Sequence, residues 1–246
     1  MDLGLRGKRC AVAAASAGLG LAVAQALAAE GAQVAICART EDTLKEAAKT
    51  FSGIPLVADM SDPDEARRFV ERAIAELGGV DILVTNAGGP PVGNFETSAF
   101  QNYEAALRTN LLSAVAMCQA AVPAMKAQKW GRVLAITSLS ARRPRPRVLM
   151  TGMARAGLTA FLKALSLEVA ADGVTVNSIQ PGLHRTARLD YLYAGKVDEL
   201  GKDIPVGVLG RPEDFGQTAA YLCSQQARYI TGSSLVLDGG LYPALY

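Results

Sequence analysis

The sequence lacks a surplus of charge of either sign. Its 246 residues include 25 lysines and arginines and 23 aspartates and glutamates, which gives a net charge of +2. A balance this even gives no electrostatic reason to expect nucleic acid as a partner. No uninterrupted apolar run approaches the roughly 18–20 residues that a membrane span needs, and residues 1–8 show no apolar signal segment. We therefore expect a cytoplasmic protein with neither a nucleic-acid nor a membrane partner.

Metal-ligand and disulfide patterns are missing as well. The four cysteines, which are Cys10, Cys37, Cys118 and Cys223, lie too far apart for paired zinc-ligand spacing. The single histidine is His184. We expect buried reduced thiols, as in cytosolic proteins, and no metal site.

What the chain does have is a regular alternation of short apolar runs and longer amphipathic segments, and 50% of its residues are hydrophobic. The runs expected to form strands are Cys10–Ala15, Gln33–Cys37, Ile54–Val57, Asp81–Thr85, Arg132–Thr137, Thr175–Ile179 and Ser234–Leu237. The segments expected to form helices are Leu19–Glu30, Glu41–Phe51, Pro63–Leu77, Tyr103–Gln128, Thr151–Ala171 and Pro212–Ser224. Continuous apolar strands between helices indicate a parallel sheet with right-handed crossovers. We predict one α/β domain over residues 1–246, a doubly wound parallel sheet (Rossmann fold) of about seven strands with helices on both faces.

A glycine-containing turn follows the first expected strand. Residues 13–20 read Ala-Ala-Ala-Ser-Ala-Gly-Leu-Gly and lead into a helix. Glycines in such a turn let the backbone approach a pyrophosphate, which then lies at the helix N-terminus, where free N–H groups and the helix dipole favour anions. A methyl group at Ala14 could narrow the turn, or be tolerated if φ there is negative. Packing alone is an alternative explanation, because Ala/Gly-rich turns are common in this fold.

Further motifs follow in a fixed order along the chain. They are Asp59-Met60 after the third strand, Asn86-Ala87-Gly88 after the fourth, Asn110 in the fourth helix, Pro181-Gly182 with Thr186 after the sixth strand, and Leu237-Asp238-Gly239-Gly240 near the end. With the turn, they resemble the short-chain dehydrogenase/reductase (SDR) family over residues 7–240, and its β-ketoacyl-acyl-carrier-protein reductases above all. The resemblance implies a homotetramer and a nicotinamide dinucleotide site. The cofactor-binding residues that it implies are Ala14, Ser16, Gly18, Leu19, Gly20, Arg39, Asp59, Met60, Asn86, Ala87, Gly88, Pro181, Gly182 and Thr186.

The end of the second strand bears on the choice of cofactor. SDRs that use NAD usually have an aspartate there, whereas this sequence has Ala38 followed by Arg39. A carboxylate would repel a 2′-phosphate and a guanidinium would bind one, so NADP(H) is favoured over NAD(H). Against this, Ala17 occupies the family's usual second basic position, and Arg39 could instead stack on adenine or face water.

The catalytic pair of the family is replaced. In SDRs a strand-end serine is followed thirteen residues later by Tyr-x-x-x-Lys, and here Ser138 is followed at those positions by Thr151 and Arg155. By resemblance, Ser138 hydrogen-bonds a substrate carbonyl, Asn110 supports a water relay and Arg155 binds the ribose. Thr151 is a poor substitute for tyrosine, because it is shorter and its hydroxyl is far less acidic than a phenol of pKa about 10. These four residues are the catalytic candidates.

Two other segments resemble the family's substrate cleft. Residues 142–147 contain four arginines, which suit phosphate or carboxylate groups, so an anionic acyl thioester would fit. A solvated loop or a subunit contact explains them equally well. Residues 185–205 resemble the substrate lid. Tyr191, Tyr193 and His184 near it could replace the missing proton donor, although packing or substrate contact is the simpler explanation of each.

Three functions remain open. The first is an atypical NADP(H)-dependent oxidoreductase, 3-oxoacyl-(acyl-carrier-protein) reductase-like, with a carbonyl or acyl-thioester substrate. The second is a nucleotide-binding SDR homologue without redox turnover, serving as a sensor or partner subunit. The third is non-redox chemistry such as dehydration. The missing tyrosine and lysine favour the second, whereas the retained Ser138 and Asn110 favour the first, which we adopt as the hypothesis.

Overall fold

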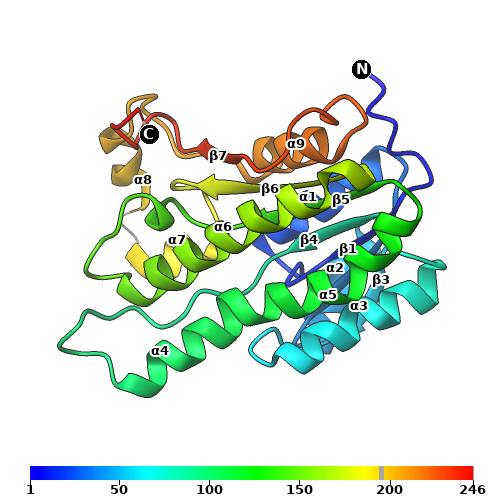
Figure 1. Ribbon diagram of the computed structural model, residues 1–246. Helices are drawn as coiled ribbons and strands as arrows, with labels where there is room; N and C mark the ends of the chain where they lie inside the picture. Colours follow the sequence, from blue (N-terminus) through cyan, green and yellow to red (C-terminus); the bar gives the residue numbers. More distant parts are fainter. Residues whose placement is uncertain (194–196, 246) are drawn as a thin grey trace.

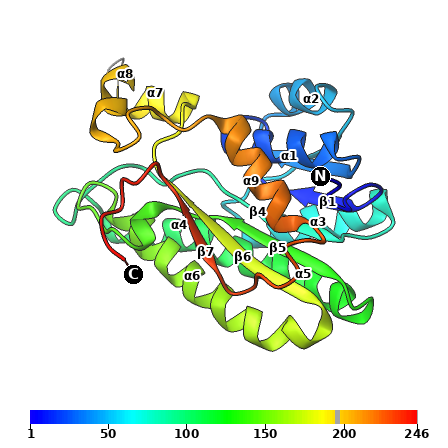
Figure 2. The same ribbon diagram turned by 90° about the horizontal axis from the view of Figure 1, so that it is seen from above.

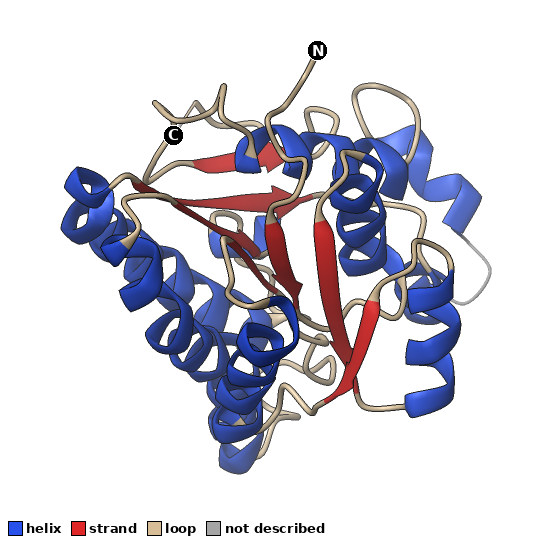
Figure 3. Ribbon diagram, turned by 90° about the vertical axis from the view of Figure 1, so that its right-hand side faces the viewer, coloured by secondary structure: helices blue, strands red, loops and turns tan. Residues whose placement is uncertain are grey.

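The computed structural model describes residues 1–193 and 197–245. Its centre is a parallel sheet of seven strands, with helices packed on both sides (Figure 3). The strands are β1 Arg9–Val12, β2 Gln33–Ala38, β3 Ile54–Val57, β4 Ile82–Thr85, β5 Gly131–Ile136, β6 Val174–Pro181 and β7 Ser234–Leu237. Their order in the sheet is β3-β2-β1-β4-β5-β6-β7. This confirms the predicted doubly wound parallel sheet.

Helices cover both faces of the sheet (Figure 1, Figure 2). One face carries α1 Gly18–Ala29, α2 Glu41–Lys49 and α9 Pro212–Cys223, and the other carries α3 Pro63–Leu77, α5 Ser113–Ala127 and α6 Leu149–Val169. Alternate residues of one strand enter the two cores: Cys10 and Val12 face α1, whereas Ala11 faces α3 and α5. The alternation explains why the strands are apolar on both faces. All four thiols are free and buried, as expected.

The prediction of one continuous helix over Tyr103–Gln128 is wrong. The structure has α4 Phe100–Leu107, then a π turn at Arg108–Leu112, then α5. A π turn adds one residue to the helical repeat, and such turns are frequent at functional sites. Phe100–Ala127 is long and apolar enough, by length and composition, to cross a membrane. Its apolar side chains include core residues of α5 such as Met117 and Met125, which are fully buried.

Two short helices follow β6 in the predicted lid. They are α7 Ala187–Tyr193 and α8 Val197–Leu200, with a 3-10 turn at Gly201–Asp203. Residues 194–196 of the predicted lid lie outside the described residues. Both helices lie beyond the carboxyl end of β6, where the lid was expected (Figure 1).

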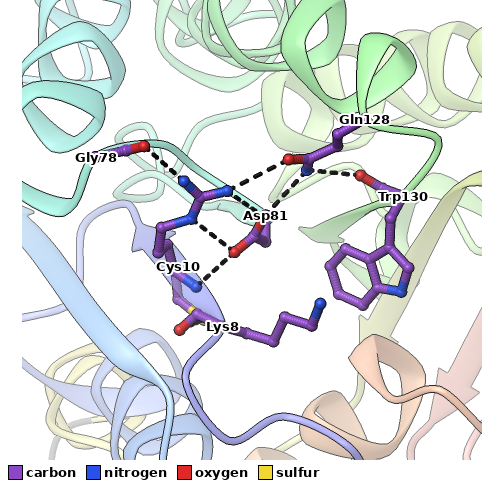
Figure 4. Close-up of polar contacts among 7 residues, drawn as sticks. Lys8, Cys10, Gly78, Asp81, Gln128 and Trp130 are labelled. Atoms are coloured by element: carbon purple, nitrogen blue, oxygen red, sulfur yellow. Dashed lines mark hydrogen bonds and ion pairs between the residues drawn. The ribbon is translucent and has the colours of Figure 1, made fainter.

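An ion-pair network lies at the edge of the sheet that is formed by the amino ends of β1 and β4 (Figure 4). Arg9 donates from Nε to Asp81 Oδ2 at 2.8 Å and from Nη2 to Asp81 Oδ1 at 2.6 Å. Gln128, just after α5, donates from Nε2 to the same Oδ1 at 3.0 Å and to the carbonyl oxygen of Trp130 at 2.8 Å. Lys8 lies over the Trp130 ring, 3.9 Å from its centroid. The network ties β1, β4 and α5 together at the edge opposite the carboxyl ends of the strands.

Candidate active site

The carboxyl ends of the strands form the edge at which ligands bind in open α/β sheets, close to the point where the strand order reverses. Here the reversal lies between β1 and β4. Two cavities lie along this edge, and each is named after one lining residue. The Arg39 cavity measures about 330 Å³ and the Ser138 cavity about 360 Å³, and Gly89 and Pro90 line both.

The turn after β1 contains a left-handed residue that is not glycine. Ala14 has a φ of 47°, so a negative φ at this position, one of the two alternatives weighed from the sequence, is wrong. Asn86 Nδ2 donates to the Ala14 carbonyl oxygen at 3.1 Å, and the Ala14 N–H points to Cys37 Sγ at 3.4 Å. These contacts hold the turn in a conformation that costs a residue with a Cβ atom free energy. The strain lies in the wall of the Arg39 cavity.

The first turn of α1 lies between the two cavities. Ser16 lines the Arg39 cavity and Leu19 lines the Ser138 cavity. Ala17, at the N-cap, has extended backbone and no side-chain hydrogen bond to the helix, so the first N–H groups of α1 are left for a ligand. A Cβ atom on Gly20 would lie 2.7 Å from the Ala14 carbonyl oxygen. Position 20 in this turn therefore requires glycine. The free N–H groups suit an anionic group, such as a pyrophosphate, that links one part of a ligand in the Arg39 cavity to another part in the Ser138 cavity.

The ends of β2 and β3 supply the polar lining of the Arg39 cavity. Arg39 is exposed, and nothing in residues 1–193 and 197–245 forms an ion pair with it. Asp59 is the single carboxylate among the described lining residues, and its Oδ1 accepts the Ser61 N–H at 2.9 Å. Met60 and Gly88 complete the wall. The cavity thus offers one free guanidinium beside one carboxylate that is already hydrogen-bonded to the backbone.

Ser138, Ser140 and Thr151 place hydroxyl groups in the Ser138 cavity. Ser138 follows β5 and begins the 3-10 turn Leu139–Ala141. Its Oγ accepts the Ser140 N–H at 3.1 Å and the Ser140 O–H at 2.8 Å. Because a serine hydroxyl has two acceptor sites and one donor, these two bonds leave the Ser138 proton for a ligand. Thr151 lies in the first turn of α6.

Asn110 and Arg155 do not line either cavity. Asn110 lies in the π turn, is 1% exposed, and neither polar atom of its side chain has a partner in the described part of the chain. Arg155 is 5% exposed and donates from Nη1 to the Ile136 carbonyl oxygen at 2.9 Å and from Nη2 to that of Ala87 at 3.4 Å. Burial lowers the pKa of Arg155 to about 10, so the guanidinium stays charged at neutral pH. The structure thus places a buried cation behind the ends of β4 and β5.

The segment after β6 forms a further wall of the Ser138 cavity. Pro181, Gly182 and Thr186 line it. His184 lines it too, but its ring packs edge-on against Phe215 with the centroids 5.3 Å apart. Burial lowers the pKa of His184, and its Nδ1 lies 3.4 Å from the Gly182 carbonyl oxygen. These contacts fit the packing role that was weighed for this histidine.

The helix α7, within the predicted lid, contributes to the same cavity. Tyr193, at the end of α7, lines it, whereas Tyr191 is 77% exposed and does not. Arg188 of α7 lines the cavity together with Arg143 and its neighbours in the loop before α6. Among the described residues that line this cavity, none is acidic.

Comparison with known proteins gives the family. The sequence matches the family model described as enoyl-(acyl carrier protein) reductase over residues 13–242. It is 32% identical to the 3-oxoacyl-(acyl-carrier-protein) reductase FabG of Escherichia coli (strain K12), covering 98% of this chain and 99% of that protein. It is also 32% identical to dehydrogenase/reductase SDR family member 4 of Sus scrofa, covering 96% of this chain and 88% of the relative. The chain belongs to the short-chain dehydrogenase/reductase family.

Solved SDR structures show the same architecture. L-sorbose reductase from Gluconobacter frateurii, complexed with NADPH and L-sorbose, superposes with a TM-score of 0.91 at 30% identity and covers 100% of both chains. The described residues of this SDR therefore have the fold of the family.

Two residues of this SDR site escaped the sequence analysis. Ser140 had no motif to mark it, although its place two residues after Ser138 is the signal that a 3-10 turn could bring the hydroxyls together. Arg188 lies in the predicted lid three residues after Arg185, where no motif marks it. Within the described residues, no group of three or more His, Cys, Asp or Glu side chains could hold a metal ion.

Proposed function

We propose that this SDR is an NADP(H)-dependent oxidoreductase that acts on a carbonyl or acyl-thioester substrate. The observation that carries the proposal is the Ser138 hydroxyl, whose acceptor sites are both occupied by Ser140 and whose proton is left for the cavity. A fixed donor of this kind suits a carbonyl oxygen, and suits the negative charge that develops on it even better.

The residues present fit the dinucleotide. The Arg39 cavity suits the adenosine half, with Arg39 and Thr40 near the 2′-phosphate, and the uncapped start of α1 suits the pyrophosphate. The residues that we assign to cofactor binding are Ala14, Ser16, Gly18, Leu19, Gly20, Arg39, Asp59, Met60, Asn86, Ala87, Gly88, Pro181, Gly182 and Thr186. When bound, NADP(H) supplies or accepts the hydride. The complex of L-sorbose reductase with NADPH supports the choice of the phosphorylated cofactor.

Proton transfer is the step in which this chain departs from the family pattern. Ser138 orients the substrate oxygen, and Thr151 adds an alkyl hydroxyl that is a much weaker acid than a phenol. Tyr193 carries the one phenol among the described residues lining the cavity, which makes it our candidate proton donor. Arg155 keeps its proton at neutral pH, and its charge favours negative charge at this edge of the sheet. Without a general acid, turnover would be slower by about 10²–10⁴-fold.

A second function is a nucleotide-binding SDR homologue without redox turnover, acting as a sensor or partner subunit. The observation that favours it is the direction of Arg155, which donates to the backbone carbonyls of Ile136 and Ala87. A guanidinium engaged in this way holds the fold together whether or not a reaction takes place.

The similarity to FabG makes 3-oxoacyl thioesters the first substrates to test. A homotetrameric assembly and a cytoplasmic location belong to the same proposal. The assembly rests on the family resemblance, and the location rests on the composition of the sequence.

The test is titration of the purified protein with NADPH and NADH, followed by turnover of a panel of 3-oxoacyl thioesters. Turnover with NADPH supports the oxidoreductase. Tight binding without turnover, with activity gained in Thr151→Tyr/Arg155→Lys, supports the second function. Failure to bind either nucleotide overturns both functions.

A variant tests the serine pair directly. Ser140→Ala removes the O–H that is donated to Ser138, and one neutral hydrogen bond contributes about 0.5–1.5 kcal/mol. We expect kcat to fall about 3- to 10-fold with an unchanged Kd for NADPH. An unchanged kcat would refute the role assigned to the pair.

A further inference from the structure

The Ser138 cavity has an unusual balance of charge. The cationic side chains that line it are Arg143, Arg145, Arg147 and Arg188. No aspartate or glutamate occurs among the described residues that line it. A cavity of about 360 Å³ that gathers cations without counter-ions concentrates positive potential where a substrate enters.

Two of these arginines have free guanidinium groups. Within residues 1–193 and 197–245, the side chains of Arg145 and Arg147 form no hydrogen bond or ion pair. Arg185, by contrast, whose neighbours His184 and Thr186 line the cavity, forms an ion pair with Asp198. The guanidinium groups of Arg145 and Arg147 are therefore available to an anion that enters the cavity.

The loop that carries them is held in place by its backbone. Pro144 and Pro146 restrict it, and the Arg147 carbonyl oxygen accepts the Gly93 N–H at 3.0 Å from the opposite rim. Arg143 anchors the start of the loop by donating from Nη1 to the Leu241 carbonyl oxygen at 2.8 Å. The free guanidinium groups thus extend from a fixed support, which limits the entropy lost when they bind a ligand.

The opposite side of the cavity is fixed as well. Arg188 donates from Nη2 to the Pro90 carbonyl oxygen at 3.1 Å, and its guanidinium lies 5.6 Å from the centroid of the Tyr191 ring. With its position set by these contacts, Arg188 adds positive charge facing the loop. An arginine guanidinium group can bind a carboxylate or a phosphate through two parallel hydrogen bonds.

We propose that the substrate of this SDR carries a carboxylate or phosphate group, which Arg145 and Arg147 bind while its carbonyl oxygen lies at Ser138. The assignment of the carbonyl to Ser138 rests on the proposed oxidoreductase function, whereas the anion site at the two arginines does not. The shared chemistry is a compact anion of one or two charges. It has two sources, the carboxylate of a small oxo acid and the phosphates of a coenzyme A thioester.

The experiment compares matched anionic and neutral substrates with NADPH. Acetoacetate is paired with ethyl acetoacetate, and acetoacetyl-coenzyme A with the acetoacetyl thioester of N-acetylcysteamine. Each pair keeps the reacting carbonyl and changes the charge. We expect kcat/KM for the anionic member of at least one pair to exceed that of the neutral member by about 10-fold or more, since hydrogen bonds to charged groups are the stronger ones. The responding pair identifies the source of the anion.

Variants locate the effect. Arg145→Gln and Arg147→Gln should each lower kcat/KM for the preferred anionic substrate about 10-fold and leave the neutral partner unchanged. Arg142→Gln is the matched control, because Arg142 is exposed on the same loop but does not line the cavity. Equal kcat/KM values within both pairs, or an equal loss in the control, overturn the proposal.

A binding arm separates failure of this inference from failure of the proposed function. Calorimetric titration of acetoacetate and acetoacetyl-coenzyme A into the protein, with and without NADP⁺, needs no turnover. Binding that is lost in Arg145→Gln/Arg147→Gln and kept in Arg142→Gln supports the anion site even if no substrate is reduced. Absence of binding by both anions overturns the anion site, whatever the redox result.

Discussion

Replacing Ala14 with glycine tests the strain in the turn after β1. The left-handed conformation, with φ of 47°, costs a residue with a Cβ atom about 1–2 kcal/mol. Glycine removes that cost but adds freedom to the unfolded chain, which opposes folding by about 0.4–1 kcal/mol. Loss of the half-buried methyl group of Ala14 also costs some free energy of burial, which reduces the gain further. The balance is a change in unfolding free energy between about zero and a gain of 1 kcal/mol.

The matched control makes the same chemical change where the backbone is ordinary. Ala75 is exposed within α3, and an Ala-to-Gly change inside a helix costs about 1 kcal/mol. Urea unfolding, followed by fluorescence of Trp130, the one tryptophan in the chain, gives both values. We expect Ala14→Gly to be more stable than Ala75→Gly by about 1–2 kcal/mol.

Equal destabilisation by the two changes would refute the reasoning, because it would mean that the turn stores no strain. A second readout is affinity for NADPH. Because Ala14 lines the Arg39 cavity, loss of its methyl group should lower the Kd rather than raise it.

Three other changes probe the turn, the lid and the distant ion pair. Gly20→Ala introduces a methyl group 2.7 Å from a backbone oxygen; it should destabilise the protein by about 1–3 kcal/mol and weaken NADPH binding, whereas Gly157→Ala, with a nearest contact of 3.4 Å, should do neither. Tyr193→Phe should lower kcat about 10²-fold or more if the phenol donates the proton, with an unchanged Kd for NADPH. Asp81→Asn should lower stability at pH 7. Burial alone would raise the pKa of the Asp81 carboxyl, but the hydrogen bonds and charge of Arg9 outweigh it and hold the pKa below its ordinary value of 3.8.

The sign of the last effect follows from the lowered pKa. A carboxyl whose pKa falls on folding stabilises the protein above its unfolded pKa and loses that contribution as the pH drops through its folded pKa. Urea unfolding at several pH values should show a constant difference between wild type and Asp81→Asn down to about pH 5, narrowing below about pH 4. A difference that grew on acidification would contradict the assignment.

For Tyr193→Phe, an unchanged kcat would exclude the phenol as the proton donor.

The strands and the long core helices could be read from the sequence because burial on both faces leaves continuous apolar runs. In β4 and β5 every residue is buried, and both strands agree with their predicted ranges to within one residue at each end. The π turn could not be read, because one extra residue hardly alters an apolar pattern of period 3.6. The short helices of the lid were missed for a related reason: a helix of seven residues such as Ala187–Tyr193 shows too few turns to display its period.

The sequence indicated which residues belong to the candidate site, but not the contacts between them or their backbone conformation. Motif order placed Ser138 at the carboxyl edge, yet no sequence pattern indicates that Ser140 fills both of its acceptor sites. The φ of Ala14 depends on contacts with Asn86 and Cys37, which are distant in sequence. Arg155 was expected at the ribose, and the structure shows it engaged with backbone carbonyls.

The burial of Arg155 has a consequence for how the site responds to its surroundings. Its pKa of about 10 keeps the charge behind the sheet edge constant across the whole neutral range, and burial lowers the pKa of His184, which favours the neutral ring. An anion that enters the cavity therefore meets the same positive charge behind the sheet edge at every pH near neutrality, so a change of pH in this range acts on the ligand and not on the charge of Arg155.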